Sequence, residues 1–332
     1  MALYPQPILW LTTSVSLVLA GCGNNGAEQP WVEYHQQLTS DLAIADIERH
    51  PPPNIGKFPE RRERLFTIPE TREGMLNIYA LRECQITSLI AARNNQLGRV
   101  APPSQHWLYE RALWQRLSAC WNSGVPDGLS DDNKARLAEL TELKTEQLPA
   151  VSWNAIFDSE EWEKSFSRAS APLNSAELPN IDNQLAAVDY LEKMVTHQFS
   201  QTWQQDSSTL ENHLKALQER PLTAEILRTL LLTQQRLAEA NVALESARLT
   251  TSECLQDDFP AGLNQVEQIS LKWLTAINRL INAQQITPPE AVKNYQDTWL
   301  SLNNPQAPWQ RFQQVKAQHH ALRDQFTSCS DN

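Results

Sequence analysis

Apolar residues recur at intervals of three and four positions along most of the chain, which is the spacing of one face of an α-helix. The pattern is clearest where Leu230, Leu237 and Leu244 stand seven residues apart, because such a seam needs helical neighbours. We expect helices over residues 31–44, 69–97, 104–121, 131–147, 181–203, 208–218, 223–254, 262–284, 288–302 and 305–328. The sequence therefore predicts an all-α fold, a disulfide-stapled helical hairpin followed by a helical bundle.

Two stretches interrupt this periodicity. The first begins with three prolines at 51–53 and includes the basic run 61–64, whose charges are matched by glutamates, so we expect a solvated loop there. The second, residues 149–179, lacks a helical period but contains Trp153, Phe157 and Trp162. Because large aromatic side chains favour burial, we expect this stretch to be irregular and packed on the body.

The first 21 residues differ in composition from the rest of the chain. They contain no charged side chain, are apolar from Ile8 to Ala20, and end in small residues directly before Cys22. This pattern is typical of a secretory signal that ends in a lipoprotein cleavage site. We expect cleavage before Cys22 and acylation of that cysteine, so that its lipids anchor the chain to a membrane. Because Gly23 follows in place of an Asp retention signal, we expect the periplasmic face of the outer membrane.

The second and third predicted helices form an antiparallel hairpin. Gly98 ends the first of them, because glycine readily adopts the left-handed conformation that closes a helix. Ser104 is the expected N-cap of the next, since its hydroxyl can accept hydrogen bonds from the free amides of the first turn. The hairpin therefore has a short turn between these two residues.

Four cysteines remain after Cys22, and the oxidising periplasm favours pairing them in one of three connectivities. Cys84 precedes Gly98 by 14 residues and Cys120 follows Ser104 by 16. At 1.5 Å per residue, both cysteines lie roughly 20 to 25 Å from the hairpin turn. We therefore expect a disulfide between Cys84 and Cys120. The two cysteines left over, which then form the second disulfide, are Cys254 and Cys329.

These features divide the chain into five regions. The predicted regions are a signal peptide (1–21), a tether (22–30), an N-terminal helical region with the hairpin (31–150), an irregular connection (151–180) and a C-terminal helical bundle (181–329). With 41% hydrophobic residues, the chain has enough apolar material for one large or two modest helical cores.

Charge narrows the range of partners. The chain has 39 acidic and 28 basic side chains, a net charge of -11, which opposes binding to the phosphate backbone of nucleic acid and to anionic lipid headgroups. It also has only 9 glycines against 20 prolines, so glycine-rich phosphate-binding loops are scarce. We expect no nucleic-acid partner, and contact with the membrane through the lipid anchor alone.

The hairpin carries the most specific sequence in the chain. Arg82-Glu83-Cys84 is followed by the run LIAARNNQLGRVAPPSQ over residues 89–105, and then by Tyr109-Glu110 and Cys120. This resembles an uncharacterised family of proteobacterial lipoproteins, the domain of unknown function 3080. The resemblance implies a lipoprotein of the Gram-negative envelope. It supplies no activity, cofactor or catalytic residue.

Polar residues gather at one end of the hairpin in this acidic protein. The candidate binding residues are Arg93, Asn94, Asn95, Arg99 and Gln105. As a site, the two guanidiniums would bind a carboxylate or phosphate while the asparagines donate hydrogen bonds. As helix ends, the same residues would cap carbonyls and pair with Glu83 or Glu110. Both interpretations stay open.

Three tryptophans, Trp107, Trp114 and Trp121, recur every seven residues and therefore share one side of the second hairpin helix. Such a row can stack on sugar rings or on a partner's apolar groups. Core packing is the interpretation we favour, because large aromatic side chains dominate protein cores.

No motif predicts a reaction. The sequence lacks His-Glu-x-x-His, a histidine pair four residues apart, Cys-x-x-Cys and Gly-x-Ser-x-Gly, so we expect no metal, no cofactor and no catalytic residue. The favoured interpretation is a non-enzymatic docking or structural lipoprotein whose partner is an envelope protein or peptidoglycan. The alternative is a hydrolase or binding protein for a small envelope ligand, using the polar hairpin end.

Overall fold

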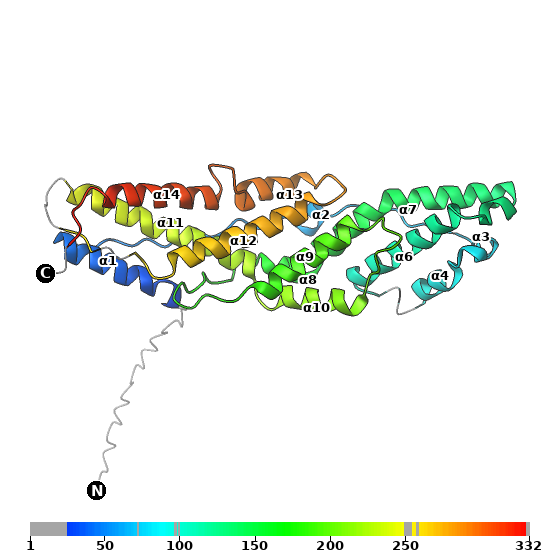
Figure 1. Ribbon diagram of the computed structural model, residues 1–332, viewed down its shortest axis with the longest axis horizontal. Coiled ribbons are helices and arrows are strands. Elements are labelled where there is room, and N and C mark those ends of the chain that lie inside the picture. Colours follow the sequence, from blue (N-terminus) through cyan, green and yellow to red (C-terminus); the bar gives the residue numbers. More distant parts are fainter. Residues whose placement is uncertain are drawn as a thin grey trace, which may run out of the picture.

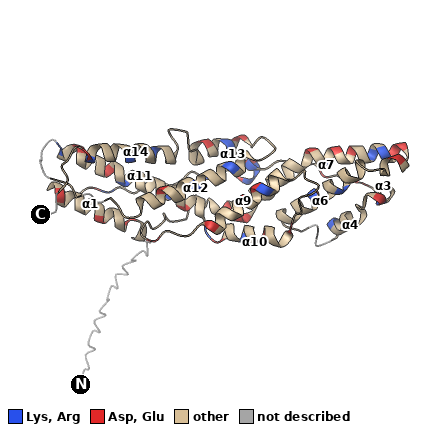
Figure 2. Ribbon diagram, in the orientation of Figure 1, with Lys and Arg blue, Asp and Glu red and all other residues tan. Residues whose placement is uncertain are grey.

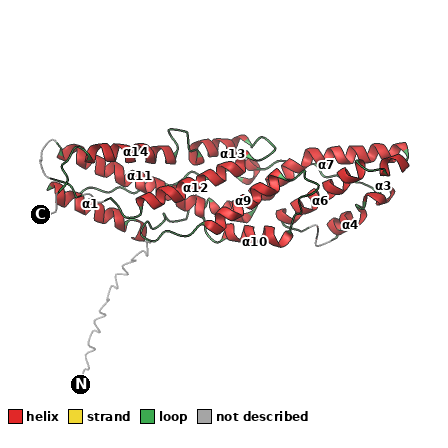
Figure 3. Ribbon diagram, viewed as in Figure 1, coloured by secondary structure: helices red, strands yellow, loops and turns green. Residues whose placement is uncertain are grey.

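The computed structural model describes residues 25–71, 73–95, 98, 100–248, 254–256 and 259–329. These residues form a long rod of helices (Figure 1) in which helix and loop account for all the backbone drawn (Figure 3). The expected all-α fold is therefore confirmed. Within the described part, one isolated bridge, between Leu255 and Ser328, is the extent of β pairing.

The helices are joined by connections of very different length. Their bounds are α1 (Gln29–Leu42), α2 (Arg61–Arg64), α3 (Met75–Ala80), α4 (Thr87–Asn94), α6 (Pro103–Trp121), α7 (Asp131–Phe157), α8 (Glu160–Ser165), α9 (Asp182–Thr196), α10 (Ser207–Gln218), α11 (Leu222–Ala247), α12 (Leu263–Asn282), α13 (Glu290–Tyr295) and α14 (Pro308–Arg323). The longest connections follow α1, α8 and α11. A 3₁₀ turn, η2 (Arg82–Cys84), lies between α3 and α4. A π turn, η4 (Gln296–Leu300), follows α13. Charged side chains of both signs are distributed along the whole rod (Figure 2).

Two hydrophobic cores lie along the rod. The larger one joins α1, the second half of α7 and helices α8 to α14, and the seam residues Leu230, Leu237 and Leu244 of α11 are fully buried in it. The smaller core lies between the hairpin and the first half of α7, where α6 packs along α7. Its members include Leu113 and Leu137. The helical seam read from the sequence therefore faces helical neighbours, as expected.

Both expected disulfides are present. Cys84 and Cys120 are joined with their Cα atoms 5.1 Å apart, and this bond ties η2 to the C-terminal end of α6. Cys254 and Cys329 are joined with their Cα atoms 4.9 Å apart. Beside the second bond, the amide of Cys329 donates to the carbonyl of Leu255 at 3.0 Å. The chain end after α14 is thereby fixed to the segment that follows α11.

The expected single helix over residues 69–97 is wrong. The structure divides this range into α3, η2 and α4, and Gln85 between them has a φ of 57°, in the left-handed region. Cys84 and Ile86 are two residues apart, so a continuous helix would direct them about 200° apart around its axis. The break allows both side chains to be buried in the smaller core. Burial and the disulfide therefore override the local helical pattern.

The expected boundary at Gln147 is also wrong. Helix α7 continues through Pro149 to Phe157, and α8 follows within the range that was expected to be irregular. A proline inside a helix costs about 3 kcal/mol. Here the turn after Pro149 buries Trp153 and Phe157 completely, and burying each large apolar side chain contributes about 1.5–3 kcal/mol. Packing therefore offsets the proline.

Several helix ends differ from the expected ones. The helix expected over 181–203 ends at Thr196, that over 223–254 ends at Ala247, and that over 305–328 occupies Pro308–Arg323. The expected N-cap at Ser104 is wrong as well. Helix α6 already begins at Pro103, whose fixed φ suits a first helical position, and the Ser104 hydroxyl instead donates to Glu211 of α10 at 2.8 Å.

Arg111 of α6 holds the hairpin to the rest of the rod. Its side chain is 0% exposed, and its guanidinium donates to the carbonyls of His197, Ser200 and Trp203 at 3.0–3.1 Å and to the side chain of Gln205 at 3.1 Å. The same guanidinium lies 4.9 Å from the centre of the Trp203 ring. The loop between α9 and α10 is therefore wrapped around one buried cation on α6.

Replacing Arg111 with lysine should lower the free energy of unfolding by about 2–4 kcal/mol. An ammonium group has three donors and no planar fork, so carbonyls of the loop lose their buried partners. The urea midpoint of the disulfide-intact chain measures this. The matched control, Arg311→Lys on the exposed face of α14, should change stability by less than about 0.5 kcal/mol. Equal urea midpoints for the two variants would contradict this stabilising role of Arg111.

Candidate functional site

A cleft of about 730 Å³ lies between α4, α6, α7 and the segment 68–73. We call it the hairpin cleft. Its floor is formed by the aliphatic side chains of Ile78, Ile86, Ile90, Leu113, Leu117 and Leu140. Its polar edge includes Arg93, His106, Tyr109, Glu110 and Lys144. A second cavity of about 310 Å³ shares Ile68, Arg93, His106 and Val151 with the first, so these four residues lie where the cavities meet.

Helical spacing explains why these side chains converge. On α6, residues 106, 109, 110, 113 and 117 are separated by three or four positions or their sums, so they share one face of the helix. On α7, residues 140, 144, 147 and 151 do the same. The α6 face is polar at its N-terminal end and apolar beyond it, and the α7 face has its polar residues between Leu140 and Val151. The packing of α6 along α7 then brings the polar residues of the two faces together.

The buried charges of the cleft are paired. Lys144 Nζ lies 3.0 Å from Glu110 Oε2, and both side chains are almost buried. His106 Nε2 lies 3.7 Å from the other oxygen of Glu110. Burial lowers the pKa of His106; Glu110 opposes this, while Arg93 and Lys144 lower the pKa further. Burial also raises the pKa of Tyr109 to about 12. At neutral pH, His106 and Tyr109 are therefore uncharged.

Arg93 is in a different position. Its Nη1 donates to the carbonyl of Gly98 at 2.7 Å, and its guanidinium lies 5.9 Å from the centre of the Tyr109 ring. Among the described residues, no carboxylate oxygen lies within 4.0 Å of its guanidinium nitrogens. An arginine normally presents five N–H donors, and a planar anion suits them best. Arg93 is therefore a cation at the cleft edge with donors left for a ligand.

The four predicted binding residues that the structure describes do not line one cleft. Arg93 and Asn94 line the hairpin cleft. The side chain of Asn95 accepts from the amide of Gly98 at 2.7 Å and thereby closes the turn after α4. Gln105 donates to Ser207 at 2.9 Å and to Glu211 at 2.8 Å, which fixes α6 to α10. Two residues, Arg99 and the predicted lipidation site Cys22, lie outside the described residues.

Sequence reasoning missed His106, Tyr109, Glu110 and Lys144. The spacing of the first three on α6 was visible, but their partner Lys144 lies on another predicted helix, and nothing in the sequence aligns the two helices.

The tryptophan row behaves largely as expected. Trp107 and Trp114 are buried, and Trp121 is 37% exposed at the end of α6.

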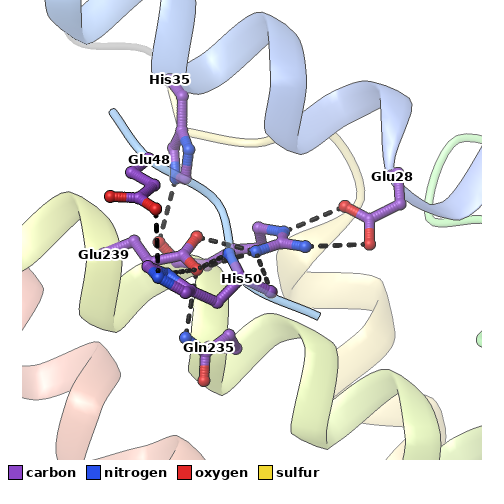
Figure 4. A network of polar contacts seen from close by, with 7 residues as sticks. Glu28, His35, Glu48, His50, Gln235 and Glu239 are labelled. Atoms are coloured by element: carbon purple, nitrogen blue, oxygen red, sulfur yellow. Dashed lines mark hydrogen bonds and ion pairs between the residues drawn. The ribbon is translucent and has the colours of Figure 1, made fainter. Parts of the chain in front are cut away.

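A second polar cluster surrounds Arg236 near the other end of the rod (Figure 4). Its Nε donates to Glu28 at 2.9 Å, and its Nη1 donates to Glu239 at 2.7 Å and to the carbonyl of His50 at 2.9 Å. Figure 4 shows Glu28 approaching from α1 and Glu239 from α11. The partners of this buried guanidinium all come from the chain itself. The cluster therefore joins the start of α1 and the loop residue His50 to α11. We interpret it as structural.

A third polar group is buried between α1, α11 and α14. His319 lies between Tyr34, whose hydroxyl it contacts, and Asn241, whose side-chain oxygen is 2.6 Å from Nδ1. Arg323 donates to the Tyr34 hydroxyl at 2.9 Å. Burial lowers the pKa of His319 to about 3. This neutral imidazole has both nitrogens occupied and serves to hold α14 in place.

Comparison with known proteins places the chain in a family. The family model described as a protein of unknown function (DUF3080) matches residues 32–330, so the chain belongs to that family. The resemblance noted in the hairpin is thereby confirmed, and the family is uncharacterised. No curated protein and no solved structure matches the chain.

Two further observations concern the part of the chain that the structure describes. In that part, no three or more His, Cys, Asp or Glu side chains are arranged to hold a metal ion. None of the described helices combines the length and the apolar character needed to cross a membrane.

The titration of His106 tests the geometry of the cleft. In nuclear magnetic resonance spectra of the labelled imidazole, its pKa should lie below 6.5. Arg93→Gln should raise it, because a nearby positive charge is removed, and Glu110→Gln should lower it further, because the compensating negative charge is removed. His213 of α10 is the control and should titrate alike in all three proteins. An unchanged His106 in both variants would contradict the arrangement.

Proposed function

We propose that the protein is a lipid-anchored envelope protein, attached through Cys22 to the periplasmic face of the outer membrane, that binds a small envelope ligand in the hairpin cleft without catalysing a reaction. The observation that carries this proposal is a cleft of about 730 Å³ with an aliphatic floor and, at its edge, the guanidinium of Arg93, which has no carboxylate partner among the described residues. Ligand sites are commonly clefts of about 300–1,000 Å³, mostly apolar, with a few polar groups that orient the ligand.

The polar groups of the cleft favour binding over the hydrolase alternative. Glu110 is occupied by Lys144. In the described chain, no hydroxyl or thiol makes a hydrogen bond to His106, whereas a nucleophile activated by histidine needs that contact. The remaining feature, a cation beside an aliphatic surface, suits recognition.

The position of the cleft supports a tethered binding protein. Helix α1, which follows the proposed anchor along the chain, lies toward one end of the rod, and α4 and α6 lie toward the other (Figure 1). A rod attached at its α1 end would hold the hairpin cleft away from the membrane. The anchor and the cleft would then not compete for the same surface.

A second candidate function is docking to an envelope protein or to peptidoglycan through α3. Its side chains Met75, Leu76 and Tyr79 are 71%, 84% and 61% exposed. Monomeric proteins seldom expose several large apolar side chains side by side, and such surfaces often contact partners. This observation supports the docking interpretation separately from the cleft.

The anchor is tested by replacing Cys22 with serine. In cells given an alkyne-bearing palmitate analogue, the unchanged protein should be labelled and should sediment with outer membranes. Cys22→Ser should abolish the label and release the protein into the periplasm, because no other acylation site is expected. The control, Cys254→Ser with Cys329→Ser, should keep the label. Equal labelling of Cys22→Ser would overturn the anchor.

Ligand binding is tested with the Cys22→Ser protein after incubation with a small-molecule extract of the envelope. Native mass spectrometry should show a bound species of defined mass. Ile90→Trp, which fills the cleft, should lose it, while Val242→Trp on the exposed face of α11 should retain it. A bound protein lost on Leu76→Lys, with no small molecule bound, would favour docking instead.

A further inference from the structure

We infer that the ligand of the hairpin cleft is an amphiphile with an aliphatic chain and an anionic head, a carboxylate or a phosphate monoester, with the head bound by Arg93. This inference rests on the proposed function and names the class of its ligand. It follows from the aliphatic floor of the cleft, from the hydrogen-bond donors that Arg93 has left for a ligand, and from the other polar groups that line the cleft.

The floor of the cleft is aliphatic. Six isoleucine and leucine side chains form it, and Tyr109, with its ring beside Arg93, is the aromatic residue of the lining. Sugar rings bind best where they stack on aromatic faces, and peptides need backbone partners. An isoleucine and leucine surface offers neither. It favours a methylene chain, whose burial gains affinity with each added carbon.

The positive charge that binds the anionic head of the ligand is that of Arg93. It lies where the two cavities meet, so an anion can approach it from the larger one while the smaller one leaves room beside it. One of its nitrogens is used by Gly98, and its remaining donors have no partner among the described residues. A guanidinium binds a carboxylate or phosphate through two parallel hydrogen bonds. Lys144 does not compete, because Glu110 neutralises it.

A second unpartnered group points to a polar ligand atom. The hydroxyl oxygen of Thr71 is buried and has no hydrogen-bond partner in the part of the chain that the structure describes, and Thr71 lines the same cleft. Leaving such a group unsatisfied is costly, whereas a ligand oxygen would satisfy it. Glu73 also lines the cleft, and its Oε2 lies 3.7 Å from Nε of Arg136, so this carboxylate is paired within the chain. The group left to interact with a ligand oxygen beside Arg93 is therefore the Thr71 hydroxyl.

The inference is tested by isothermal titration of the Cys22→Ser protein with octanoate, decanoate and dodecanoate below their micelle concentrations. Affinity should rise about fourfold for each methylene, the factor expected for burying one such group. Dodecanol and dodecyltrimethylammonium should bind at least about tenfold more weakly than dodecanoate, because charged hydrogen bonds are lost. Dodecyl phosphate, compared with dodecanoate, tells whether the natural head is a phosphate or a carboxylate.

Substitutions of Arg93 test whether this residue binds the anionic head of the ligand. Arg93→Gln should weaken dodecanoate binding about tenfold or more and leave dodecanol unchanged, and Arg93→Lys should restore part of the loss. The matched control, Arg82→Gln, removes a guanidinium from the hairpin outside the cleft and should bind as the unchanged protein does. Circular dichroism of each variant checks that the fold is retained.

Three results would overturn the inference. They are equal binding of dodecanol and dodecanoate, affinity that does not depend on chain length, and dodecanoate binding that Arg93→Gln leaves unchanged. If these probes fail while an envelope extract still yields a small molecule that Ile90→Trp excludes, the proposed function stands and the ligand class is wrong. If neither binds, both proposals fail.

Discussion

A buried guanidinium surrounded by main-chain carbonyls determines how the two parts of the rod are joined. Arg111 gives its hydrogen bonds to the loop between α9 and α10, where the carbonyls of His197, Ser200 and Trp203 accept them. Gln115, one turn further along α6, donates to the same Ser200 carbonyl at 2.9 Å. Arg111 and the cleft residue Glu110 are neighbours on α6. The hydrogen bonds of Arg111 therefore also fix the position of α6 as one wall of the cleft. Arg236 performs the same task between α1 and α11, where carboxylates replace most of the carbonyls.

The hairpin cleft exists because the chain does not follow its local helical preference. If residues 69–97 formed one helix, its regular surface would pack along α6 as α7 does. Instead the break at Gln85 turns α4 away from the line of α3, and the Cys84–Cys120 bond holds the break against α6. The aliphatic side chains of α4 and α6 therefore line a space that no side chain of either helix fills, and Ile90 remains half-buried at its wall.

What the sequence predicts well is set by short-range periodicity, and what it misses is set by partners far along the chain. The seam of α11 and the Cys84–Cys120 disulfide follow from spacing along the chain, and the Cys254–Cys329 disulfide follows by elimination. The buried state of Arg64 does not: the basic run 61–64 was expected to be solvated, yet Arg64 is buried and donates to the carbonyl of Phe157 at 2.8 Å. In the candidate site, Arg93 and Asn94 were found from their composition. Lys144 was missed because its contact depends on the register between α6 and α7.

The length of the rod limits where the proposed ligand comes from. Helix α7 alone, with 27 residues, extends about 40 Å, and the cleft lies beside it in the half of the molecule remote from α1. With the rod standing upright on its anchor, an amphiphile embedded in the anchoring membrane would have to reach the cleft through water. Bending the rod back toward its own anchor would be unfavourable, because it would strain the hydrogen bonds of the buried guanidiniums Arg111 and Arg236. If the protein is anchored as proposed, its ligand therefore reaches the cleft from the aqueous space or from a surface facing the anchoring membrane.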